Sequence, residues 1–355
     1  MRKKINININ SKSSLRFLGR SWSILFLLIL IAIFAIANVK FFTLASIQNV
    51  LLAATLIMLV GTGETFVVIS GGIDLSPAYV VGLSASIGAI IMRTLYAMTD
   101  LDQGLIVIIG MASGVLFSIV PGFINGAIIA KLKVPSFIVT LGTMSIAEGA
   151  VFLSNNGLPV TNLPPFVGKI GNTSLFYYTS GHGVFFRIPE GVDPRTAVAI
   201  LPIPIIILAF VLIIVGFILA KTIFGQHIYA IGGNINAANL AGVPVDRVLI
   251  KVYVIASLMY GIAGMVYVLR FSVASPSAGE PLLLSSVGAV FIGGASMKGG
   301  YGSISGTVIG ALIIAVLQTG LVMANISPFY QYIAVGLVII IAVLFDNYKT
   351  RFLME

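Results

Sequence analysis

The stretch that decides the fold reads Gly71-Gly72-Ile73-Asp74-Leu75-Ser76-Pro77. It separates two apolar runs, and the first, roughly residues 46–70, is long enough to cross a bilayer. The paired glycines predict a break between two helices. Ser76 is the expected N-cap of the second helix, and Pro77 suits its first turn because its missing N–H costs nothing there.

An aspartate within this break restricts where the segment lies. Near the centre of a bilayer, Asp costs about 2.5–3.5 kcal/mol. Non-helical backbone at membrane depth persists only where protein or water satisfies its polar groups. The segment is therefore predicted to line a cavity or a membrane–water boundary. The alternative is that Asp74 caps a helix at the cytoplasmic surface, which is compatible with transport.

The composition places the chain in the membrane. Of its 355 residues, 58% are hydrophobic and only 9% are charged, and the mean hydropathy is +1.10. A soluble domain is about 25% charged. Cysteine is absent, which excludes disulfides, thiolate metal sites and a cysteine nucleophile. His182 and His227 lie far apart in sequence, so we expect no histidine metal site.

Apolar runs predict an all-α polytopic membrane protein with about ten spans. The runs lie near residues 22–38, 46–70, 77–98, 104–130, 135–153, 198–220, 250–270, 284–297, 303–324 and 328–345. The run at 284–297 is short and is a candidate re-entrant segment. An even number of spans places both termini on one side of the membrane.

The basic residues indicate that this side is cytoplasmic. With that orientation, 14 of the 20 basic residues lie inside and six lie outside, as the positive-inside rule requires. The net charge of +9 then needs no nucleic acid to explain it. The outside residues are Lys40, Arg93, Lys169, Arg187, Arg195 and Arg270.

The predicted spans divide the chain into a tail and one domain. We expect residues 1–20 to form a cytoplasmic tail and residues 21–350 a single transmembrane domain. The basic start and apolar run imitate a signal peptide, but the basic region is long and cleavage would leave an odd number of spans, so an uncleaved anchor is predicted.

The loop 154–197 lies outside and is too long for a simple connection. It is a lid, a docking surface for an external partner, or merely an elaborated loop.

Small residues recur at every fourth position in two segments. Such stripes let a neighbouring backbone approach closely, so they predict helix packing rather than ligand sites. Pro121 within the first stripe is expected to kink its helix. The stripes are Gly110, Gly114, Ser118, Gly122, Gly126 and Ala130, and then Gly302, Gly306 and Gly310.

The sequence contains no machinery for ATP hydrolysis or covalent catalysis. It has no phosphate-binding loop and no His-Glu-x-x-His motif. Glu64 and Glu148 are not paired in sequence with a nucleophile. No catalytic residue is therefore expected, and active transport would draw its energy from an ion gradient or from another subunit.

The inside loop 221–249 contains a short helix with its own start and stop signals. Asn234 or Asn236 can cap its start, Gly242 can end it in the left-handed conformation, and Pro244 prevents its continuation. The helix is small and nearly uncharged, which suits a groove on another protein. The alternative is a helix at the lipid interface, but that position favours basic residues and this helix has none.

Several motifs resemble the permeases of ribose-type ABC importers. They are residues 63–76, which contain the Gly71-Gly72 break; residues 134–143; residues 224–238, which end in the short inside helix; and residues 327–331. Together they form a specific pattern, and the resemblance covers about residues 20–350. One departure is Ser285, where many members of the family carry an acidic residue, so a role for that acid is in doubt here.

The resemblance implies a set of partners in the bacterial inner membrane. These are a second permease copy or close homologue, two cytoplasmic ATPase subunits that carry ATP and Mg, and an extracytoplasmic solute-binding protein. The chain itself would bind no cofactor. The short inside helix would be the coupling helix that contacts an ATPase groove, with residues Gly233, Asn234, Asn236, Ala237, Ala238, Asn239, Leu240, Ala241 and Gly242.

The implied substrate is a monosaccharide, a pentose or a hexose. A neutral sugar needs a weakly polar path, and for each residue of that path helix capping or helix–helix hydrogen bonding is an equal alternative. The path residues predicted on this basis are Glu64, Thr65, Asp74, Ser76, Asn125, Thr140 and Thr143.

Two other functions stay open from the sequence. The same importer type could carry a nucleoside or an autoinducer-like sugar. A stand-alone proton-coupled carrier could use Glu64, Asp74 and Glu148 as proton sites. An intramembrane enzyme is disfavoured because no nucleophile–base pair is evident.

Overall fold

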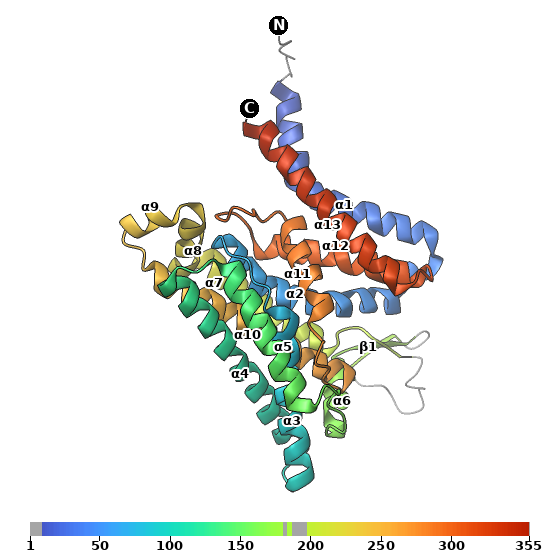
Figure 1. Ribbon diagram of the computed structural model, residues 1–355. Helices are drawn as coiled ribbons and strands as arrows, with labels where there is room; N and C mark the ends of the chain where they lie inside the picture. Colours follow the sequence, from blue (N-terminus) through green and yellow to red (C-terminus); the bar gives the residue numbers. More distant parts are fainter. Residues whose placement is uncertain (1–8, 180–182, 187–196, 355) are drawn as a thin grey trace.

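The fold is a bundle of long helices with one small sheet, seen in a computed structural model (Figure 1) that describes residues 9–179, 183–186 and 197–354. The helices are α1 (Ile9–Ala37), a 3-10 turn (Val39–Phe42), α2 (Leu44–Ile69), α3 (Pro77–Met98), α4 (Gln103–Leu132), α5 (Ser136–Asn155), α6 (Pro165–Asn172), α7 (Ile203–Lys221), α8 (Ile223–Gly233), α9 (Ile235–Leu240), α10 (Val245–Phe271), α11 (Glu280–Ile292), α12 (Ile304–Met323) and α13 (Pro328–Met354).

Seven helices in the described part are long and apolar enough to cross a membrane. They are α2, α3, α4, α5, α7, α10 and α12. Three further predicted spans are helical but have shorter apolar stretches, namely Trp22–Ala37, Glu280–Ile292 and Phe329–Ile341. The polytopic helical fold is thus confirmed, whereas the count of ten spans and the side on which the termini lie stay predictions.

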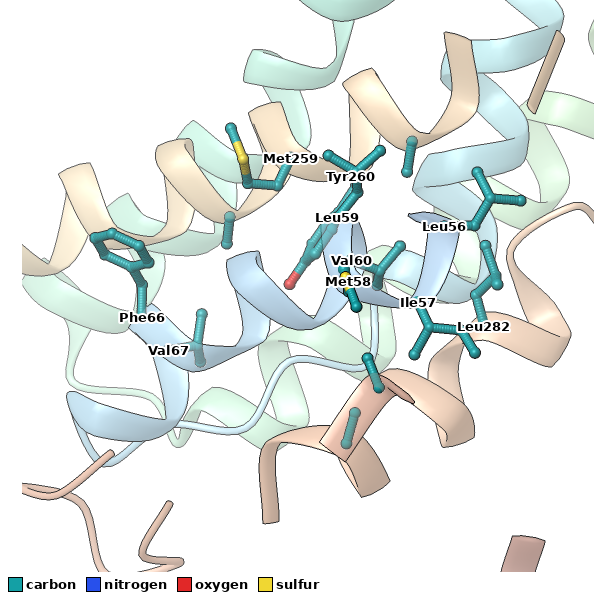
Figure 2. Close-up of a cluster of buried hydrophobic side chains, with 14 of the residues drawn as sticks. Leu56, Ile57, Met58, Leu59, Val60, Phe66, Val67, Met259, Tyr260 and Leu282 are labelled. Atoms are coloured by element: carbon teal, nitrogen blue, oxygen red, sulfur yellow. The ribbon is translucent and has the colours of Figure 1, made fainter. Parts of the chain in front are cut away.

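Helix α2 lies at the centre of the bundle. Every side chain from Ala54 to Ile69 is buried, and α2 packs against α7, α10, α11 and α12. A helix that is hydrophobic on all sides is expected in such a position. Figure 2 shows buried side chains of α2, among them Leu59 and Phe66, in one cluster with Met259 and Tyr260 of α10 and Leu282 of α11.

The glycine stripes pack helices together, as predicted. A Cβ at Gly122 would lie 2.6 Å from the Tyr253 carbonyl oxygen of α10, and one at Gly126 would lie 2.7 Å from Ile250 Cα. In the second stripe, a Cβ at Gly310 would lie 2.0 Å from the Ala289 carbonyl oxygen of α11. The nearest atoms of the neighbouring helix are backbone atoms at Gly126 and Gly310, and the Ser257 Cβ at Gly122. Helix α4 continues through Pro121 without interruption, and the kink expected there stays a prediction.

The long loop after α5 contains a sheet that the sequence did not predict. Strands β1 (Tyr177–Thr179), β2 (Gly183–Phe185) and β3 (Val198–Ala199) form an antiparallel sheet in the order β2-β1-β3. The strands are too short to show an alternating pattern. His182, Arg187 and Arg195 lie outside the described residues. The loop's extracytoplasmic location stays a prediction.

Candidate functional site

The break between α2 and α3 turns the chain back beside α2. Gly71 has φ +86°, a conformation that glycine adopts without strain, and it lies just after the last turn of α2. A Cβ on Gly72 would lie 2.4 Å from the Tyr253 hydroxyl oxygen, so a larger residue there would require the Tyr253 side chain to move. The chain then continues without regular secondary structure to Pro77, where α3 begins as predicted.

Two buried carboxyl groups meet across this break. The Tyr260 hydroxyl of α10 lies 3.0 Å from Glu64 Oε1 and 3.2 Å from Asp74 Oδ2. The exposed fraction is 0% for Glu64 and 1% for Asp74. Tyr260 itself is buried, and Figure 2 shows its hydroxyl oxygen directed toward α2. This contact joins α2, α10 and the break.

Ser76 is the N-cap residue of α3 by position, as predicted, but its side chain does not make the expected capping bond. The Ser76 N–H donates to Asp74 Oδ1 at 2.8 Å, and Ser76 has φ −67° and ψ −23°. An N-cap residue normally has extended backbone. In its helical conformation Ser76 makes no side-chain capping bond. Asp74, two residues before Ser76, instead accepts the hydrogen bond from the Ser76 N–H. The Ser76 hydroxyl instead lies 3.5 Å from Asn125 Nδ2.

Helix α5 holds the break from the other side. Thr140 Oγ1 accepts from the Leu75 N–H at 3.1 Å and lies 3.2 Å from the Ile73 carbonyl oxygen. Ser136 Oγ accepts from the Ile73 N–H at 3.1 Å. Three backbone polar groups of the non-helical segment, the Ile73 N–H, the Ile73 C=O and the Leu75 N–H, are therefore paired with side chains of α5. Non-helical backbone inside a membrane would need such partners.

Six of the seven predicted path residues belong to one polar network around the break. Glu64 and Asp74 share Tyr260, Ser76 contacts Asn125, Thr143 donates to Asn125 Oδ1, and Thr140 binds the break itself. The seventh, Thr65, hydrogen-bonds instead to Thr307 of α12 at 2.6 Å. All seven are buried. That they line a substrate path stays a prediction.

A second glycine-rich segment, the loop between α11 and α12, contacts both the end of α2 and α8. The loop 293–303 between α11 and α12 passes beside the end of α2, where the Gly300 N–H donates to the Ile69 carbonyl oxygen at 2.8 Å. A Cβ on Gly232 of α8 would lie 1.7 Å from that same oxygen and 2.5 Å from the Gly300 nitrogen. We call Ile69, Gly232 and Gly300 the glycine junction.

Tyr229 ties α8 to this loop a second time. Its hydroxyl donates to the Gly302 carbonyl oxygen at 2.8 Å. Burial raises the pKa of Tyr229 above its ordinary value, so the hydroxyl keeps the proton that it donates.

The short inside helix forms as predicted. Asn234 is the cap, because its side chain accepts from the Ala237 N–H at 3.0 Å. Gly242 has φ +82°, and Pro244 follows shortly after it. Leu240 is 90% exposed, whereas Ala238 is the one buried residue between Gly233 and Gly242. Helix α9 therefore presents an apolar tip, and Figure 1 shows it protruding beside α8.

A further acidic contact escaped the sequence analysis. The Tyr79 hydroxyl donates to Glu280 at the start of α11, and Glu148 of α5 interacts with the same hydroxyl. Phe152 lies beside the Tyr79 ring, with 6.3 Å between centroids. The signal that could have pointed to it is Glu280 directly before Pro281, at a helix start. Ser285, by contrast, bonds to the Pro281 carbonyl oxygen of its own helix.

Residues 46–343 match a protein family described as branched-chain amino acid transport system / permease component. The chain belongs to this permease family. The match begins in α2 and ends in α13, so it includes the break, the glycine junction and α9. No solved structure matches this permease.

Permease proteins for ribose and for L-arabinose are similar to this chain over nearly its whole length. The ribose import permease protein RbsC of Haemophilus influenzae is 36% identical over 333 residues, which is 94% of each chain. RbsC of Bacillus subtilis is 37% identical over 91% of each chain. The L-arabinose ABC transporter permease protein AraH of Azospirillum brasilense is 33% identical over 94% of this chain and 89% of its own.

Proposed function

We propose that this chain is the membrane-spanning subunit of an ATP-driven importer that carries a monosaccharide. The observation that carries the proposal is the similarity to ribose and L-arabinose import permeases over more than 90% of the chain. A pentose is accordingly the first substrate to test. ATP and Mg would be bound by a partner, and the sugar would be delivered by a solute-binding protein on the outer side.

We place the chain in a bacterial inner membrane with ten spans and both termini in the cytoplasm. The seven long apolar helices and three shorter ones support this arrangement, and so does the excess of basic residues on the side assigned to the cytoplasm. The permease pairs with a second copy or with a close homologue.

The ATPase is proposed to bind α9. Ile235 and Leu240 are exposed on this helix, and a cleft beside it is lined by Asn236, Asn239 and Val243, with the exposed ion pair of Lys133 and Asp246 at its edge. An apolar tip next to a polar cleft suits a helix that binds a groove. In this arrangement, the coupling residues are Gly233, Asn234 and residues 236–242.

The glycine junction supplies a route from α9 to the break. Helix α8 precedes α9 directly, and Gly232 contacts the end of α2 and the α11–α12 loop without an intervening side chain. Movement of α9 on ATP binding would displace these two segments together. Because α2 also carries Glu64, the displacement reaches the polar network around Asp74. The transport cycle is then a shift of population between two packed states.

Uptake into proteoliposomes tests the proposal. The permease would be reconstituted with a cognate ATPase and a loaded binding protein, and labelled ribose, arabinose, a hexose and a nucleoside would be supplied in turn. We expect uptake of a pentose only with ATP and both partners, and none with a non-hydrolysable ATP analogue. Uptake by the permease alone under a pH gradient would instead make it a proton-coupled carrier.

A further inference from the structure

Glu64 and Asp74 have one proton donor between them on the Tyr260 side. The Tyr260 hydroxyl carries a single hydrogen, yet it lies within hydrogen-bonding distance of an oxygen of each carboxyl group. The other oxygen of Glu64, Oε2, is buried and has no partner among the described residues. Asp74 is better served, because its second oxygen accepts from the Ser76 N–H.

No basic side chain in the described part of the chain compensates the two carboxyl groups. Glu64 and Asp74 interact with each other and with Tyr253 and Tyr260 of α10, and none of these side chains carries a positive charge. Helix α5 and the start of α3 contribute only hydroxyl and amide groups, from Thr140, Ser136 and Ser76. Two uncompensated charges at these buried positions would repel each other and would lack hydration.

One proton removes this conflict. If Glu64 Oε1 carries it, Oε1–H donates to Tyr260 Oη, and the Tyr260 O–H donates onward to Asp74 Oδ2. Each hydrogen then has one acceptor, and Asp74 keeps its charge with two donors. Glu64 Oε2 becomes the carbonyl oxygen of a neutral acid, which costs less to leave unpaired than a carboxylate oxygen.

We propose that Glu64 is a proton-binding site. Its bound proton is donated in a hydrogen bond to Tyr260, the Tyr260 O–H donates in turn to Asp74, and this chain of two hydrogen bonds holds the break against α2 and α10. Loss of the proton leaves two like charges beside a single donor, and the segment around Asp74 then separates from α2.

Infrared spectroscopy of the purified full-length permease tests the proposal. At neutral pH, the spectrum of the wild type minus that of Glu64→Gln should contain the C=O stretch of a protonated carboxylic acid, shifted to lower frequency in heavy water. The matched control is Asp246→Asn, which removes an exposed carboxylate paired with Lys133 and should leave the acid band unchanged. A difference spectrum that contains only carboxylate bands overturns the proposal.

Three further measurements complete the test. If Glu64→Gln does not fold, carbon-13 labelling of glutamate in the wild type replaces it, and an acid band that ignores the label refutes the assignment to a glutamate. Tyr260→Phe should shift the acid band without abolishing it, because the proton loses its acceptor. A band that appears only when sodium is absent would mean that a cation occupies the site, which also contradicts the proposal.

Discussion

Replacing Gly232 by alanine should damage the glycine junction. The new Cβ would lie 1.7 Å from the Ile69 carbonyl oxygen, far inside van der Waals contact, and the obstacle is backbone rather than a flexible side chain. Helix α8 must therefore be forced away from α2, and the Gly300 N–H then gives up its 2.8 Å bond to Ile69. A Cβ on the neighbouring Gly233 would meet no atom within 4 Å, so Gly233→Ala is the matched control for stability.

The magnitude follows from three contributions. Overpacking costs about 1–3 kcal/mol, and loss of a buried backbone hydrogen bond costs about 1–3 kcal/mol. Alanine returns about 1 kcal/mol of helix propensity. The net destabilisation of Gly232→Ala is therefore about 3 kcal/mol. At about 2 °C per kcal/mol for a large chain, the thermal midpoint should fall by about 6 °C.

The assay is thermal denaturation in detergent, followed by size-exclusion chromatography of the folded fraction. Gly233→Ala should match or slightly exceed the wild type, whereas Gly232→Ala should lie clearly below it. Equal midpoints for the two variants would refute the reasoning, because they would show that α8 tolerates a side chain at the junction. In the reconstituted system, Gly232→Ala should also transport less sugar per ATP hydrolysed.

Three other predictions concern separate contacts. Leu240→Glu should leave the thermal midpoint unchanged, because the side chain is 90% exposed, and should reduce co-purification of the ATPase; wild-type co-purification would contradict docking at α9. Asn234→Ala should cost about 1 kcal/mol through loss of the helix cap and should show as faster hydrogen exchange in α9. Gly126→Ala should cost about 1–3 kcal/mol because its Cβ would lie 2.7 Å from Ile250 Cα. Gly142→Ala, whose Cβ would meet no atom within 4 Å, should not lower the midpoint, and equal effects of the two would argue against the packing.

Local signals predicted the helices and their ends well. Long apolar runs predicted α2 to α5, and the capping residues Asn234 and Gly242 predicted α9, because each of these features depends on residues close together in sequence. The glycine stripe of α4 also predicted a close neighbour. It did not say which helix that neighbour would be.

The contacts that complete the site could not be predicted, because they join distant segments. Tyr260 lies 196 residues from Glu64 and 186 from Asp74 in sequence. The bond between Thr65 and Thr307 spans 242 residues. Periodicity places a residue on a helix face but does not identify the opposite helix. The same reason explains why Thr65 was grouped with Asp74, although it faces α12.

The close contact between α4 and α10 at the glycines of α4 has a consequence for how this protein changes shape. The nearest α10 atoms are backbone atoms of Ile250 at Gly126, and the Ser257 Cβ and the Tyr253 carbonyl oxygen at Gly122. A rotamer change moves none of these atoms, so none can absorb sliding or rotation there. The pair should therefore travel as one rigid body. Bending is then confined to the ends of the pair, where Lys133 and Ser272 leave their helices in the left-handed conformation. A cross-link placed across the pair should be harmless, and one placed across α8 and α2 should arrest the cycle.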